Sequence, residues 1–208
     1  ELDWHLEDGT ALRVKQETQY PWKGLVTMTL TPAQTAEFAL HVRIPGWSRR
    51  NSVRVNGQTV TGVASGKYLT IRRSWKPGDR VTLDFSMTPE LIASNPLVRE
   101  NTGKVALERG PLVYCLEQPD QLAPVDDLAL REASKPFAAE FDKDLLGGIV
   151  ILKHEGEAFV KPLGDQPLYQ PAALEKKPAT KPLELRFIPY YAWANRGQHA
   201  MEVWVPLP

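Results

Sequence analysis

Cysteine is almost absent from this sequence of 208 residues, and its scarcity excludes two kinds of structure. Cys115 is the only cysteine, so no disulfide can form within the chain and no cage of cysteine thiolates can hold a zinc ion. A chain of this length accommodates two domains of roughly 100 residues each. Domains of that size bury enough surface to fold without such cross-links.

An excess of positive charge is also missing. Lysine plus arginine number 25 and aspartate plus glutamate number 25, which gives a formal net charge of zero. Proteins that bind nucleic acids owe much of their affinity to a basic face that neutralises phosphates, so we predict no nucleic-acid partner. No apolar run approaches the roughly 18–20 residues that a membrane helix requires, so we predict no membrane partner.

The first ten residues, "ELDWHLEDGT", lack the charged and then apolar pattern of a signal peptide. They are typical of a segment from inside a longer protein, and we expect the natural N-terminus to lie upstream. The compartment stays open. A single unpaired cysteine without a signal peptide slightly favours a cytoplasmic location.

Motifs of the common metal and cofactor sites are missing as well. No histidine lies three or four residues from another, which excludes the spacing of metal ligands on a helix. The stretch "HEGE" (154–157) lacks the second histidine of a zinc protease motif. The stretch "GVASGKY" (62–68) is one residue short of a phosphate-binding loop. We therefore predict no metal or cofactor site in this chain.

Candidate catalytic residues are few. Glycoside hydrolysis requires two carboxyl groups across the scissile bond, and acids cluster in three places, at Asp126 and Asp127, Asp142 and Asp144, and Glu155 and Glu157. Each cluster is predicted to lie in a loop or turn, where charge is ordinarily solvated. Cys115 stands in the apolar stretch "PLVYCLE", where a buried structural thiol is expected. We predict no catalytic residue.

Alternation of apolar and polar residues dominates the first ninety positions. In "AEFALHVRI" (36–44) and "DRVTLDF" (79–85), every second residue is apolar, as in strands of an antiparallel sheet with one solvated face. Asn56 and Gly57 give the strongest short signal for a β-hairpin. These patterns predict an all-β first domain over residues 1–92, with an antiparallel, jelly-roll-like β-sandwich as its simplest form.

A second β-sandwich is predicted over residues 93–208. The prolines of 87–101 interrupt the first pattern, and strands resume in "GKVALERG", "GPLVYCLE" and "GGIVILKHEG". Residues 161–182 contain five prolines and are predicted to be irregular, because proline removes ladder donors and breaks helices. Segment 117–147 leaves room for a short helix.

Aromatic residues are the remaining candidates for a functional surface. The stretch "RFIPYYAWANRG" (186–197) is rich in rings, and monomers seldom expose apolar patches beyond about 300–600 Å². Most of these rings should therefore be buried in the core or against a neighbouring domain. One or two are candidates for stacking on a sugar. The candidate carbohydrate or domain-interface rings are Trp47, Trp75, Tyr190, Tyr191 and Trp193.

In order and spacing, seven stretches resemble the C-terminal part of glycoside hydrolase family 127, whose founding activity is β-L-arabinofuranosidase. They are "ETQYPWKGLVTMTL" (17–30), "LHVRIPGWS" (40–48), "VRVNGQ" (53–58), "YLTIRRSWKPGDRVTLDFSMTPEL" (68–91), "GKVALERGPLVYCLE" (103–117), "GGIVILK" (147–153) and "IPYYAWANRG" (188–197). The resemblance covers practically the whole chain.

The resemblance implies a division of labour. Members of the family are similar in having an N-terminal (α/α)6 barrel, which carries the glutamate acid/base, the cysteine nucleophile and the zinc site, followed by two β-sandwich domains. None of the barrel motifs occurs here, and Cys115 matches a strand of the second sandwich. The implied role is ancillary: support of the parent's barrel and formation of a homodimer. Residues 195–197 are expected to form the turn into the final strand.

The alternative is a carbohydrate-binding module that uses its surface aromatics to bind an arabinose-containing glycan. A third hypothesis is catalysis by an acid pair. Exposure of the rings, and two carboxyl groups facing one pocket, are the features that separate these hypotheses.

Overall fold

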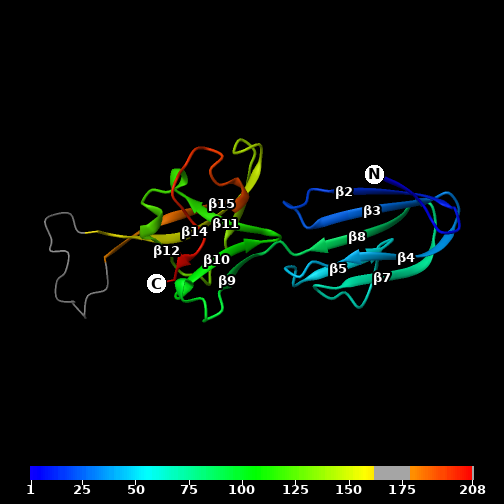
Figure 1. The fold of residues 1–208 in the computed structure, drawn as a ribbon, viewed down its shortest axis with the longest axis horizontal. Helices are drawn as coiled ribbons and strands as arrows, with labels where there is room; N and C mark the ends of the chain where they lie inside the picture. The colour runs from blue at the N-terminus through cyan, green and yellow to red at the C-terminus, as the bar shows by residue number, and fades with distance from the viewer. Residues whose placement is uncertain (162–178, 208) are drawn as a thin grey trace. The chain divides into compact units, whose positions relative to one another are not determined.

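The computed structural model describes residues 1–161 and 179–207, and the chain divides into two compact units, Glu1–Thr88 and Pro89–Pro208 (Figure 1). Both units consist of antiparallel strands, and helical structure in the described residues is limited to 3-10 turns. These turns are η1 (Arg99–Asn101), η2 (Gln118–Asp120), η3 (Val125–Asp127) and η4 (Tyr190–Ala192). The predicted all-β fold of sandwich-like domains is confirmed. The segment 117–147, which left room for a helix, contains only η2 and η3 among these turns.

The first unit combines a six-stranded sheet with a two-stranded sheet. In spatial order the larger sheet contains β1 (Leu2–His5), β2 (Ala11–Thr18), β3 (Leu25–Pro32), β8 (Asp79–Phe85), β5 (Asn51–Val55) and β6 (Gln58–Thr59). The smaller sheet pairs β4 (Ala36–Arg43) with β7 (Tyr68–Trp75). The predicted strands "AEFALHVRI" and "DRVTLDF" correspond to β4 and β8.

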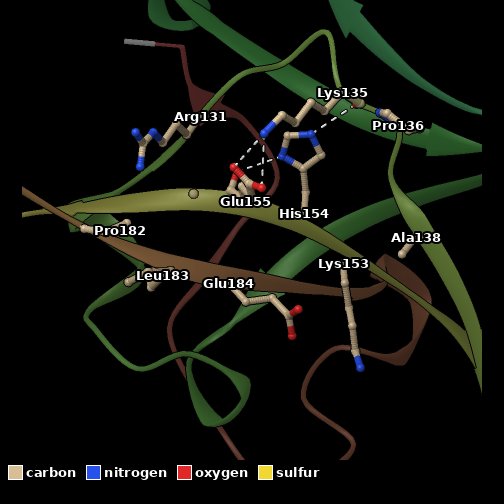
Figure 2. A pocket seen from close by; sticks show the side chains of 11 residues that line it. Arg131, Lys135, Pro136, Ala138, Lys153, His154, Glu155, Pro182, Leu183 and Glu184 are labelled. Carbon is tan, nitrogen blue, oxygen red and sulfur yellow. Dashed lines mark hydrogen bonds and ion pairs between the residues drawn. The ribbon is translucent and has the colours of Figure 1, made fainter.

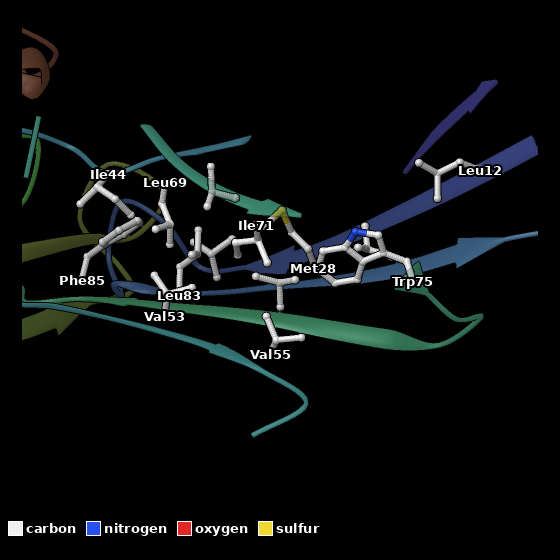
Figure 3. Packing of buried hydrophobic residues seen from close by; sticks show 14 residues of the cluster. Leu12, Met28, Ile44, Val53, Val55, Leu69, Ile71, Trp75, Leu83 and Phe85 are labelled. Atoms are coloured by element: carbon white, nitrogen blue, oxygen red, sulfur yellow. The ribbon is translucent and has the colours of Figure 1, made fainter. Parts of the chain in front are cut away.

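Alternating side chains from both sheets form the core of the first unit (Figure 3). In β8, Val81, Leu83 and Phe85 are buried, whereas Arg80 and Asp84 on the opposite face are exposed and Thr82 is half-buried. The buried residues of β8 belong to one cluster with apolar side chains of β3, β4, β5 and β7. Because side chains point to opposite faces with a period of two, the sequence pattern decides which face of each strand turns inward.

Turn residues fix the hairpins of this unit. Asn56 and Gly57 adopt φ values of 50° and 82°, as a type I′ turn requires, and they connect β5 to β6. The carboxylate of Asp79 accepts hydrogen bonds from the Lys76 backbone N–H at 2.9 Å and from the Asn56 side-chain amide at 2.8 Å. These bonds, the backbone bond of Lys76 foremost, lower the pKa of Asp79.

The second unit contains a nine-stranded sheet. Its main path contains β12 (Leu128–Leu130), β14 (Ile149–Phe159), β15 (Thr180–Pro189), β11 (Leu112–Glu117), β10 (Lys104–Arg109) and β17 (Val205–Pro206). Beside this path, β13 (Ala138–Asp142) pairs with β14, β16 (Met201–Glu202) with β11, and β9 (Pro89–Ala93) with β10. Strand β9 belongs to the second unit because all five of its residues pair with β10.

The proline-rich segment predicted over 161–182 lies mostly outside the described residues. Its end differs from the prediction, because β15 starts at Thr180 and places Pro182 opposite Glu157 of β14. In the described residues β15 pairs with β11 only at Phe187–Pro189, so its first residues form a free edge. Proline is tolerated at such an edge because no ladder bond is lost there.

Candidate functional site

The two candidate tryptophans of the first unit differ in exposure. Trp75 is fully buried: its ring lies 5.7 Å from that of Phe38, and its indole N–H donates to the Phe38 carbonyl at 3.1 Å. This burial corrects the surface role predicted for Trp75, whose ring fills the core between the sheets (Figure 3). Trp47 is half-buried, with its ring 6.3 Å from Tyr20 and 5.9 Å from Phe85.

The three candidate rings of the second unit reach the surface. Tyr190, Tyr191 and Trp193 expose 46%, 58% and 37% of their surface. The rings of Tyr190 and Trp193 are 6.2 Å apart and inclined by only 13°. The Trp193 indole N–H donates to the His199 carbonyl at 3.2 Å, which fixes the ring. A parallel, partly exposed aromatic pair is a candidate for packing against a sugar ring or another domain.

A buried ionic cluster holds the segment that follows these rings. Glu117, at the end of β11, is fully buried, and its carboxylate accepts the Ala194 N–H at 3.0 Å and a hydrogen bond from the Arg196 guanidinium. Arg196 also donates to Asp120 at 3.0 Å. These carboxylates, Asp120 foremost, raise the pKa of Arg196. The predicted turn at 195–197 is thus tied to β11 by charge, a contact that sequence reasoning missed.

Cys115 lies on the same strand and is fully buried. It stands opposite Ile188 of β15. Burial raises the pKa of its thiol to about 12, and the charges of Glu117 and Asp120 add to that increase. A nucleophilic thiolate requires an electropositive, partly exposed setting. Cys115 is instead fully buried and lies near the carboxylates of Glu117 and Asp120. The buried thiol predicted from "PLVYCLE" is confirmed.

Two of the three acid clusters serve turns and ion pairs. Asp142 accepts the backbone N–H of Asp144 at 3.1 Å and pairs with Arg186 at 2.7 Å. Asp127, within η3, pairs with Lys161 at 2.7 Å. The Asp142 carboxylate thereby stabilises the local backbone, whereas an ion pair with an exposed lysine such as that of Asp127 contributes little to stability.

The third cluster corrects the prediction of a loop. Glu155 and Glu157 lie in β14, which continues to Phe159. Gly156 between them is buried, and a Cβ at this position would overlap the side chain of Leu185. The glycine therefore marks close packing of β14 on β15 instead of a turn.

A pocket of about 480 Å³ lies along β14 and β15 (Figure 2). Glu155 and Glu184 both line it and occupy directly paired positions on β14 and β15. The two carboxylates point in different directions, because Glu155 turns to the Lys135 ammonium at 3.2 Å while Glu184 points away from it (Figure 2). Glu155 is thus held in an ion pair, an arrangement that favours a structural role over an acid pair.

His154 closes the same pocket and joins two segments. Its Nδ1 lies 2.7 Å from the Glu155 carbonyl oxygen and its Nε2 lies 3.2 Å from the Lys135 carbonyl oxygen. Its ring packs on Phe137 at 4.2 Å. The imidazole therefore fastens the loop before β13 to β14.

Residues 1–161 and 179–207 contain neither a cluster of metal-binding side chains nor a helix that could span a membrane. No three side chains of histidine, cysteine, aspartate or glutamate gather there as a metal site. None of the helical segments in this part of the chain is long and apolar enough to cross a membrane.

Comparison with known families covers nearly the whole chain. The profile described as "Beta-L-arabinofuranosidase, GH127 middle domain" matches residues 1–87. The profile described as "Glycoside hydrolase family 127 C-terminal domain" matches residues 89–206. Each match lies within one of the two compact units of the structure.

Individual relatives agree with these profiles. The chain is 32% identical over 209 residues to a non-reducing end β-L-arabinofuranosidase of Bifidobacterium longum subsp. longum, covering 95% of this chain and 30% of that protein. The structure of the present chain resembles that of a GH127 β-L-arabinofuranosidase from Geobacillus stearothermophilus T6, with a TM-score of 0.90 and 40% sequence identity. The match covers 100% of this chain and 32% of the Geobacillus chain. A second GH127 β-arabinofuranosidase structure gives a TM-score of 0.83 at 36% identity, with 99% and 33% covered.

The chain therefore spans about a third of the length of these relatives. The family resemblance carried by the seven sequence stretches is confirmed. This chain belongs to glycoside hydrolase family 127.

Proposed function

We propose that these residues form a non-catalytic pair of β-sandwich domains in a glycoside hydrolase of the β-L-arabinofuranosidase type. Their role is to support a catalytic barrel in another part of the protein. The observation that carries this proposal is the structural use of the reactive groups: the Cys115 thiol is buried with its pKa raised to about 12, and Glu117 and Asp120 are bound by Arg196.

The sugar class in this proposal follows from the relatives. Proteins named as β-L-arabinofuranosidases match this chain over 95% and 100% of its length, yet about two thirds of each lies outside the match. That remainder is where we place the acid/base glutamate, the cysteine nucleophile and the zinc site of the family. L-arabinofuranosides are accordingly the proposed substrates of the parent enzyme.

An activity assay on the purified 208-residue chain tests the proposal. The chain is incubated with an aryl β-L-arabinofuranoside, zinc and a reductant, beside a GH127 arabinofuranosidase that includes the barrel. We expect no release of the aryl group above buffer from the chain and release from the longer enzyme. The proposal would be overturned if the chain hydrolysed the substrate and if Cys115→Ser or Glu117→Gln abolished that activity.

The second candidate function is binding of arabinose-containing glycans, and the parallel, exposed rings of Tyr190 and Trp193 favour it. Titration with arabino-oligosaccharides, followed by tryptophan fluorescence, tests it. We expect a saturable change that Trp193→Ala removes. A titration without any change contradicts this candidate.

The same rings are also a candidate contact surface for two protein partners. These partners are the catalytic barrel of the parent enzyme and a second copy of the chain. Light scattering over a range of concentrations measures the mass of the chain and of Trp193→Ala. A dimer that dissociates in Trp193→Ala supports a homodimer through this surface. A monomer at every concentration contradicts the homodimer.

A further inference from the structure

The first unit has a groove of about 540 Å³ between its larger sheet and β4. Its floor consists of apolar side chains that are each less than a tenth exposed, namely Val26, Met28, Val42, Leu83 and Phe85. Its polar rim consists of Gln16, Thr18 and Tyr20 on one side and His41 and Arg43 on the other. An apolar floor with a few polar groups around it is the usual composition of a small-molecule site.

The aromatic side of the groove is fixed by contacts within the unit. The Thr18 hydroxyl accepts the Tyr20 backbone N–H at 3.0 Å and donates to the Leu25 carbonyl at 2.9 Å. The Tyr20 ring, 40% exposed, lies 6.3 Å from the ring of Trp47. Trp47 in turn packs edge-on against Phe85 of the floor at 5.9 Å. Tyr20 therefore presents a ring whose position does not depend on a ligand.

Among the described residues, the lining of the groove contains a positively charged side chain and no negatively charged one. Arg43 is exposed, no aspartate or glutamate lines the groove, and within the described residues Arg43 makes no ion pair. Burial raises the pKa of Tyr20, and a hydrogen bond with Trp47, followed by the positive charge of Arg43, partly offsets that increase. A cation and an aromatic ring share one cavity in a chain whose formal net charge is zero.

We infer that this groove binds a saccharide that carries a carboxylate, with a uronic acid residue as the group recognised. Arg43 pairs with the carboxylate, Tyr20 packs against the face of the sugar ring, and the Gln16 amide hydrogen-bonds to hydroxyl groups. The site goes beyond the proposed function, because it lies in the first unit and requires neither catalysis nor the rings of Tyr190 and Trp193.

The guanidinium is the reason for choosing an acidic sugar over a neutral one. Arginine pairs with carboxylates through two parallel hydrogen bonds, which are stronger than bonds between neutral groups. A neutral saccharide that covers Arg43 removes water from the cation without supplying a counter-charge, and that costs free energy. The same groove should therefore discriminate between sugars by charge.

Titration of the ¹⁵N-labelled chain, followed by NMR, tests the inference with three probes: trigalacturonate, neutral arabinotriose and acetate. We expect trigalacturonate to shift the amide signals of Thr18, Tyr20 and Arg43 with a dissociation constant of about 0.1–10 mM, as for a shallow site. Arabinotriose and acetate should bind at least about tenfold more weakly.

Matched variants locate the site. Arg43→Ala should weaken trigalacturonate binding at least about tenfold, whereas Arg54→Ala removes the same charge from β5 outside the groove and should change it less than about twofold. Tyr20→Phe should retain binding and Tyr20→Ala should lose it. Trp193→Ala should have no effect, which separates this site from the second candidate function.

Four outcomes overturn the inference. They are no shift with trigalacturonate, equal binding of arabinotriose, equal binding of acetate, and equal weakening by Arg43→Ala and Arg54→Ala. The indole signal of the buried Trp75 reports folding of each variant, and Arg43→Gln replaces Arg43→Ala if that signal moves.

Discussion

The two units of this chain bury different kinds of groups. In the first unit the buried polar side chains are Thr10, Ser48 and Asp79, and the one carboxylate among them, Asp79, lies at a turn. The second unit buries Glu117 within its sheet and His154 on β14. Arg196 reaches that carboxylate from 79 residues away.

This difference shows where each unit is vulnerable. An apolar core tolerates changes of sequence when shape and volume are kept. A buried ion pair contributes little net stability when intact, because both charges lose their hydration, but removal of one partner leaves an uncompensated charge. The first unit should therefore respond to steric changes, and the second to removal of charge.

The largest effect is expected from Arg196→Ala, which leaves Glu117 and Asp120 without their guanidinium. The free energy of unfolding of the second unit should fall by about 3–5 kcal/mol. Hydrogen exchange measured by mass spectrometry should show faster exchange in β11 and β15, with β3 and β8 unchanged.

Arg131→Ala is the matched control, since Arg131 is an exposed arginine of the same unit. It should cost less than about 0.5 kcal/mol. Equal losses for Arg131→Ala and Arg196→Ala would contradict the structural role of the ionic cluster.

A smaller loss is expected from Gly24→Ala in the first unit. A Cβ at this position would overlap the carbonyl oxygen of Phe85, whose N–H donates to the Gly24 carbonyl at 3.2 Å. We expect a loss of about 2–3 kcal/mol, measured by urea unfolding, with faster exchange confined to β3 and β8. Gly46→Ala is the control, because the nearest heavy atom to its Cβ is 3.9 Å away. Indistinguishable stabilities of these two variants would refute the steric account.

The smallest effect is expected from Asp79→Asn and depends on pH. The pKa of Asp79 is lower in the folded state than its usual value, so its charge stabilises the fold above the ordinary aspartate pKa of about 3.9. That contribution is lost as the pH falls through the folded-state pKa. The free energy of unfolding of the native chain should exceed that of Asp79→Asn by about 1 kcal/mol at pH 7. This difference should shrink and disappear as the pH falls below about 4. A gap that is constant with pH would contradict this role.

Local patterns predicted much of the first unit, because its strands alternate and its hairpin signals are short-range. Val81, Leu83 and Phe85 face the core as their spacing indicates. The burial of Trp75 was harder to predict. On the face of β7 that includes Leu69, Ile71 and Trp75, the charged Arg73 interrupts the series of apolar residues. The structure explains this exception, since the Arg73 guanidinium lies 5.3 Å from the centre of the Trp75 ring.

The candidate sites were less predictable, because they depend on contacts between distant residues. The pairing of Glu117 with Arg196 has no local signal. The groove also combines Tyr20, which follows β2, with Arg43 at the end of β4, and neither residue stands out by itself. Exposure of Tyr190 and Trp193 depends on the turn η4, whereas aromatic composition alone favours burial.

The reactivity of Cys115 tests most directly whether the chemically capable groups of this chain are structural. As the only cysteine, it gives an unambiguous signal with a thiol reagent at neutral pH. We predict labelling at least about a hundredfold slower in the folded chain than in urea, because modification requires the second unit to open. Labelling of the folded chain at the rate of the unfolded one would contradict this account.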